Sequence, residues 1–119
     1  MKKLVLPHGE MELHQNYAVL RVFENEHICL EKAKGTFEIL KSFFRAKNFI
    51  LIAHRTKNYS IDKEVFKNAT LKNFIGFGVV SNLPEARNRA IEEQNYFDRN
   101  FAFFEELQEA IEWSKTFFK

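Results

Sequence analysis

The stretch from Arg55 to Ser60 holds the residues best suited to chemistry, because two basic side chains, Arg55 and Lys57, precede a tyrosine and a serine. Ser60 stands where a short helix is expected to begin, so its hydroxyl is a candidate helix cap. A phosphate on Ser60 would add about −1.5 to −2 charges, which the helix dipole and the basic loop would favour. The unmodified loop could instead hold a small anion over exposed backbone N–H groups.

Other reactive side chains show no pattern typical of an active site. The histidines are never spaced as HxH or HxxxH, so we expect solvated or capping side chains and no metal site; they are His8, His14, His27 and His54. Cys29 precedes a predicted helix without a His or acid pattern nearby, which favours a small buried thiol over a nucleophile. Phosphate-binding glycine loops, GxSxG and HExxH are absent from the sequence. We therefore expect neither an enzyme nor a bound cofactor.

Composition bounds the class of protein. The 119 residues fit a single domain, 1–119, and a net charge of +2 is too small to indicate a nucleic-acid partner. The fourteen phenylalanines are interpreted as core residues, because few basic residues lie among them. One cysteine allows no internal disulfide, and the apolar run before Pro7 has only three residues, 4–6, too few for a signal peptide or a membrane span. These features predict a soluble cytoplasmic protein.

Runs of apolar residues predict alternating strands and helices. We expect strands at 4–6, 11–15, 17–23, 49–53, 74–80 and 100–104, the first two forming a hairpin around Pro7 and Gly9. Helices are expected from Leu30 to before Asn48, from Ser60 or Asp62 to Asn68, over 82–96 and over 105–118, with Lys115 and Lys119 at the end of the last. An Asn82 and Glu85 capping box is expected to begin the third helix.

The order of elements indicates an α/β fold, with a mixed, mostly parallel sheet, an antiparallel N-terminal hairpin and about four helices. Two glycines within one predicted strand, Gly76 and Gly78, should allow a neighbouring helix to approach closely.

This order, with the local sequence, resembles the SpoIIAA-like STAS domains, the fold of bacterial anti-sigma-factor antagonists, and especially their small stand-alone relatives. The resemblance covers nearly the whole chain and is carried by four passages: Leu4 to Phe23, Leu30 to Lys34, Phe74 to Asn82 and Phe101 to Trp113. In the antagonists, an Asp and then a phosphorylatable Ser followed by Gly open a helix. Ser60 matches that serine by position, whereas the neighbouring Asp and Gly are absent.

The resemblance implies a non-enzymatic regulatory domain that docks a protein partner through the loop and helix from Thr56 to Lys67. Arg55, Thr56, Lys57, Tyr59 and Ser60 are then the candidate partner-binding or phospho-switch residues, and Arg55, Lys57 and Tyr59 are expected to project around the helix N-terminus. A homodimer is a further possibility. The alternative is binding of a small apolar ligand or lipid between helices and sheet, because the STAS fold resembles the lipid-binding Sec14 architecture. A cavity of roughly 300 Å³ or more would favour that alternative.

Overall fold

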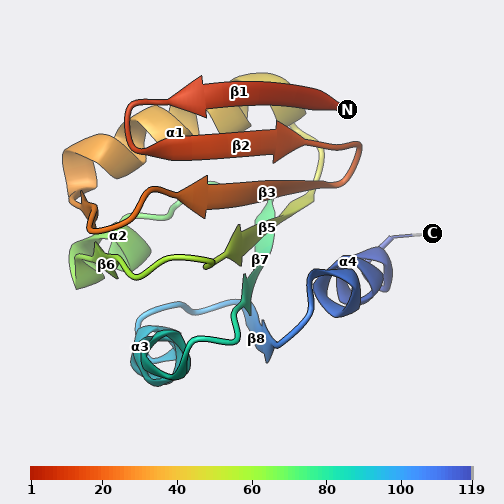
Figure 1. The fold of residues 1–119 in the computed structure, drawn as a ribbon. Helices are drawn as coiled ribbons and strands as arrows, with labels where there is room; N and C mark the ends of the chain where they lie inside the picture. Colours follow the sequence, from red (N-terminus) through yellow and green to blue (C-terminus); the bar gives the residue numbers. More distant parts are fainter. Residues whose placement is uncertain (119) are drawn as a thin grey trace.

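Six strands form one sheet in the computed structural model, which describes residues 1–118. In spatial order they are β1 (Lys2–Leu6), β2 (Gly9–Leu13), β3 (Tyr17–Val22), β5 (Phe49–His54), β7 (Phe74–Val80) and β8 (Asn100–Phe104). Within this order, β1 pairs with β2 and β2 pairs with β3 in the antiparallel sense, whereas β3 with β5, β5 with β7 and β7 with β8 are parallel pairs. The predicted mixed sheet with an N-terminal antiparallel hairpin is confirmed (Figure 1).

Four helices cover the two faces of this sheet. They are α1 (Leu30–Phe44), α2 (Lys63–Lys67), α3 (Pro84–Gln94) and α4 (Leu107–Lys115). The first three connect successive parallel strands, and right-handed crossovers in one direction along a sheet place such helices on the same face. Accordingly, Leu40, Phe66 and Ala90 share one core cluster, whereas Ala110 of α4 belongs to a second. Lys119, predicted to end the last helix, lies outside the described residues.

The helix starts differ from the predicted caps. The N-cap of α3 is Leu83 and its side chain makes no capping bond, so the capping box predicted at Asn82 is wrong. Pro84 occupies the first helical position, where its fixed φ suits the first turn and sets the boundary. At α4, the backbone N–H of Glu106 donates to the Glu109 carboxylate at 3.2 Å, a capping contact that we did not predict.

The glycines of β7 admit α4, as predicted. A Cβ atom on Gly78 would lie 3.2 Å from Cζ3 of Trp113, and one on Gly76 would lie 3.4 Å from Cη2 of the same ring. The indole ring therefore rests on backbone that carries no side chain. On the other face, Phe44, Phe49 and Phe74 stack with ring centroids 4.4 and 5.3 Å apart, so these three are core residues as expected. The prediction is wrong for Phe23 and Phe43, which are exposed.

A second, two-stranded sheet was not predicted. The strands β4 (His27–Ile28) and β6 (Ser60–Ile61) pair in parallel, so that His27 lies opposite Ser60. Two residues are too short for an apolar alternation to reveal a strand. The pairing ties the segment before α1 to the segment before α2. No helix among residues 1–118 is both long and apolar enough to cross a membrane.

Candidate functional site

Ser60 lies in strand β6, with its hydroxyl held by a histidine from the neighbouring strand. Its Oγ atom is 2.6 Å from Nδ1 of His27, and Nε2 of the same ring is 2.8 Å from Oδ1 of Asp62. Ser60 and Asp62 are two residues apart in extended chain, so their side chains point to the same side and the imidazole spans both. This arrangement fixes the orientation of the hydroxyl.

Ser60 is not the cap of helix α2. The N-cap residue is Asp62, and its side chain bonds His27 instead of the helix backbone. The predicted role of Ser60 as a helix cap is therefore wrong, although the alternative start at Asp62 is correct. The sequence pattern misplaced Ser60 because the β4 to β6 pairing, which joins residues 33 positions apart, extends the chain there.

A serine, a histidine and a carboxylate joined in series are also the groups of a hydrolase triad. Here the side chains of His27 and Asp62 are 54% and 45% exposed, so water competes for each of their polar atoms. A well-hydrated imidazole and carboxylate provide little of the preorganised low-dielectric environment that catalysis by such groups requires. The cluster therefore suits holding and presenting the Ser60 hydroxyl better than activating it.

Two of the predicted site residues, Arg55 and Tyr59, are buried. Arg55 is 2% exposed and Tyr59 is 5% exposed, so neither projects around the helix N-terminus as expected. Nε of Arg55 donates to the Tyr59 hydroxyl at 3.0 Å, and Nη2 donates to the carboxylate of Glu93 on α3 at 2.5 Å. A buried charge needs a partner, and Glu93 provides it from 38 residues away.

This buried network perturbs the titration of its members. Burial raises the pKa of the Glu93 carboxyl above its usual value, although the Arg55 guanidinium opposes that change. Burial also opposes the charge on Arg55, but Tyr59 and Glu93 together raise the pKa of the guanidinium. The Nη1 atom of Arg55 is buried without a hydrogen-bond partner among the described residues.

Further bonds attach the predicted loop to its surroundings. The Ser81 hydroxyl donates to the Arg55 carbonyl at 2.7 Å, and it also accepts from the backbone N–H of Leu83 at the start of α3. Arg89 on α3 donates to the Tyr59 carbonyl at 2.8 Å. The loop before Ser60 is thus fixed to α3 from both ends.

The exposed part of the predicted site is smaller than expected. Thr56 and Lys57 are exposed, and Ser60 is partly exposed at the edge of an open groove of about 580 Å³. The groove lies between α3 and the segment from β6 to α2. Acidic and basic side chains both line it: Asp62, Lys63, Arg89, Glu92 and Glu93.

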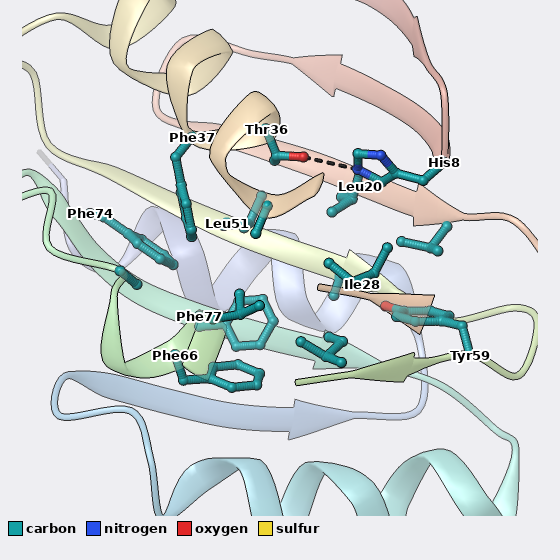
Figure 2. Close-up of a pocket in the computed structure, with 16 residues that line it drawn as sticks. His8, Leu20, Ile28, Thr36, Phe37, Leu51, Tyr59, Phe66, Phe74 and Phe77 are labelled. Carbon is teal, nitrogen blue, oxygen red and sulfur yellow. Dashed lines mark hydrogen bonds between the residues drawn. The ribbon is translucent and has the colours of Figure 1, made fainter. Parts of the chain in front are cut away.

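A separate small cavity lies between α1, α2 and the sheet. Its volume is about 60 Å³ and its wall is almost entirely apolar, with Phe37, Phe66 and Phe77 among the lining residues (Figure 2). The main polar feature is a hydrogen bond of 3.0 Å between Nε2 of His8 and Oγ1 of Thr36. Burial lowers the pKa of His8, which favours the neutral ring.

The other histidines and the cysteine differ in part from expectation. His8 is buried and His54 has a buried Nδ1 without a partner among the described residues, so these two are not solvated. His27 is exposed, and His14 stacks on Tyr17 with ring centroids 4.4 Å apart. Cys29 is not the buried thiol that we predicted, because it is the partly exposed N-cap residue of α1. Within residues 1–118, no three His, Cys, Asp or Glu side chains gather as a metal site would require.

Comparison with solved structures identifies the fold. The chain is similar to a protein of the DUF3478 family with a SpoIIAA-like fold from Shewanella loihica PV-4, with a TM-score of 0.58. The alignment covers 87% of this chain and 90% of that chain, at 12% sequence identity. No protein-family description and no curated protein matches the sequence. The chain therefore has the SpoIIAA-like α/β fold that its sequence resembles.

Proposed function

We propose that this chain is a non-enzymatic regulatory domain that docks a protein partner through the loop and helix from Thr56 to Lys67. The observation that carries the proposal is the Ser60 hydroxyl, which His27 holds at the edge of an open groove. A polar group that is fixed in orientation and reachable from solvent costs little ordering entropy when a partner binds it. The buried Arg55 network beneath the loop provides the rigid base for such recognition.

The charges around the groove favour a protein partner over nucleic acid. Lys63 and Arg89 line the groove together with Asp62 and Glu92, so neither sign dominates. A nucleic acid would need a basic surface that releases counterions, whereas paired charges of both signs are typical of protein interfaces and set their specificity. The unpaired Cys29 thiol supports a reducing compartment, and we place this role in the cytoplasm.

We further propose that modification of Ser60 regulates docking. A phosphate on Oγ would remove the hydroxyl proton, and with it the hydrogen bond between the Ser60 hydroxyl and Nδ1 of His27. It would also add negative charge beside Asp62. The resulting repulsion would alter the β4 to β6 surface that a partner contacts. Arg89, which lines the same groove, is the basic residue suited to receive such a phosphate.

The alternative function, binding of a small apolar ligand, has less support. The apolar cavity holds about 60 Å³, whereas pockets for drug-sized ligands usually hold about 300 to 1,000 Å³. A lipid or similar ligand would need α2 and the β4 to β6 pair to move outward.

Site-directed photo-crosslinking in cells of the native host tests the docking proposal. A photoreactive amino acid at Lys57 should give a defined crosslinked protein, whereas the same residue at Glu38, an exposed position on α1, should not. The Ser60→Asp substitution should then change the yield of the Lys57 adduct. The proposal fails if position 57 gives no protein adduct, or if position 38 gives the same adduct with the same yield.

A further inference from the structure

The strand β8 forms an edge of the main sheet that carries no protecting charge. It pairs with β7 on one side only, and its residues are Asn100, Phe101, Ala102, Phe103 and Phe104. The last four are all partly exposed. The opposite edge, β1, includes Lys2 and Lys3, and lysine is a common device that prevents edge strands from pairing with another chain. None of the five residues of β8 is charged.

The hydrogen-bond pattern shows which backbone groups of β8 are available. Phe104 pairs with Val80 of β7, and its carbonyl accepts from the backbone N–H of Ser81 at 3.0 Å. Backbone groups in a strand point alternately to the two sides, so Asn100, Ala102 and Phe104 face β7. The N–H and C=O groups of Phe101 and Phe103 therefore point away from the sheet.

We propose that a second copy of this chain binds here, with the two β8 strands antiparallel and the twofold axis at Ala102. Phe101 then lies opposite the partner's Phe103, and Phe103 lies opposite the partner's Phe101. Each of these pairs exchanges two N–H···O bonds, as hydrogen-bonded antiparallel pairs do, which makes four bonds across the interface. Twofold symmetry uses the same patch of each copy, so the edge is its own complement.

Charge complementarity selects this register. Continuing the pairing by two residues places Arg99 opposite the partner's Glu105 at both ends of the interface. Glu105 is exposed. On the β7 side of the strand, Nη1 of Arg99 donates to the carbonyls of Leu71 and Phe74 at 2.8 and 2.9 Å, and its Nε lies 3.7 Å from Oδ1 of Asp98, so the pair with the partner's Glu105 would form through Nη2. A shift of two residues in either direction would remove both ion pairs. These pairs set register and orientation, because exposed ion pairs add little affinity.

Side chains add to the same arrangement. Phe101 and Phe103 lie on one side of β8, where Phe101 contacts Phe77 and Phe97, and Arg87 lies over the Phe103 ring. Antiparallel pairing brings each of these rings beside a ring of the other copy, and cross-strand aromatic pairs stabilise sheets. Two six-stranded sheets would thus join through β8 into one continuous sheet.

Sedimentation velocity and light scattering of the whole chain test the proposal over a range of concentrations. The expected result is a reversible species of twice the 14.2 kDa chain mass. Glu105→Lys would set lysine against the partner's Arg99 and should weaken dimerisation about tenfold or more. Glu38→Lys, with the same charge change on α1, should have no effect. A monomer at all concentrations, or a dimer that Glu105→Lys leaves unchanged, overturns the proposal.

Amide hydrogen exchange gives a second measurement that needs no variant. The N–H groups of Phe101 and Phe103 should exchange about tenfold more slowly in concentrated than in dilute protein, because only the dimer buries them. The N–H of Phe104, which faces β7, should show little change and serves as the internal control. If the amides of Phe101 and Phe103 each exchange at the same rate in dilute and in concentrated protein, the proposed β8 interface is overturned. The docking proposal at Ser60 would be unaffected, because its test uses other residues.

Discussion

Arg55 and Glu93 meet inside the protein, with Nη2 of the guanidinium 2.5 Å from the carboxylate oxygen. Arg55 follows the last residue of strand β5, and Glu93 lies on the inner face of α3. The pair joins the loop that leads to Ser60 to a helix that lines the neighbouring groove. The shape of the candidate docking surface therefore depends on a buried contact that a partner would not touch.

Removal of one member of this pair should destabilise the fold strongly. Glu93→Ala leaves the buried Arg55 charge without a carboxylate, and breaking a buried pair in this way typically costs about 3 to 5 kcal/mol. Glu92→Ala, an exposed change on the same helix, should alter the free energy of unfolding by less than about 0.5 kcal/mol. Urea denaturation monitored by circular dichroism measures both. Similar midpoints for the two variants would show that the pair does not support the fold.

Replacing glycine by alanine should have opposite effects on the stability of the protein at Gly35 and Gly78. Gly35 lies in α1 with no atom within 4 Å of an added Cβ, so Gly35→Ala should stabilise the protein by about 0.5 to 1 kcal/mol. Gly78→Ala would place a Cβ 3.2 Å from the Trp113 ring and should destabilise it by about 1 kcal/mol or more. Denaturation midpoints give both values.

Trp113 is the only tryptophan and therefore reports on its own packing. The wavelength of its fluorescence emission maximum should shift in Gly78→Ala, where the ring must move, and should stay unchanged in Gly35→Ala. A native Gly78→Ala protein with wild-type emission and stability would contradict the close approach of α4 to β7.

Ser60→Ala should affect stability only slightly. The hydroxyl does not cap α2, and its bond with His27 is exposed to solvent, so we expect a loss near 0.5 kcal/mol, the lower end for one hydrogen bond. Ser60→Asp should destabilise the β4 to β6 pair more than Ser60→Ala, because a second carboxylate would face Asp62. Hydrogen exchange of the amides at the β4 to β6 pair measures this local effect. Faster exchange in Ser60→Ala than in Ser60→Asp would contradict the prediction.

Stability should fall as the solution is acidified through the range in which histidine titrates. Burial lowers the pKa of His8 below its usual value of 6.5, so the unfolded chain binds the proton more tightly than the folded chain. The stabilising effect of neutral His8 is complete above about pH 6.5 and is lost as the pH falls through the folded pKa. His54 acts in the same direction, because burial lowers its pKa as well.

The test compares the pH dependence of the unfolding free energy in wild type, His8→Asn and His54→Asn between about pH 7.5 and 5. Each variant should lose part of the dependence on pH. If the unfolding free energy of His8→Asn depends on pH as steeply as that of wild type, folding does not oppose the protonation of His8.

The sequence alone determined the elements of the main sheet. β5 and β7 are continuous apolar runs, and only a strand covered on both faces explains such runs at that length, so their positions could be predicted. The three-and-four spacing of α1 was equally clear. These strands and this helix depend on residues that are close together in the sequence, so the local spacing of apolar residues predicts them. The antiparallel start and parallel remainder followed from the order of the elements.

Only the tertiary structure decided the candidate site. Arg55 and Tyr59 looked like exposed loop residues, because nothing near them in the sequence indicates that Glu93 would provide a buried partner. His27 and Ser60 meet through a two-residue strand pair that leaves no periodic signal. Ion pairs and hydrogen bonds between residues more than 30 positions apart depend on how the chain packs, and a single sequence carries no local pattern for them.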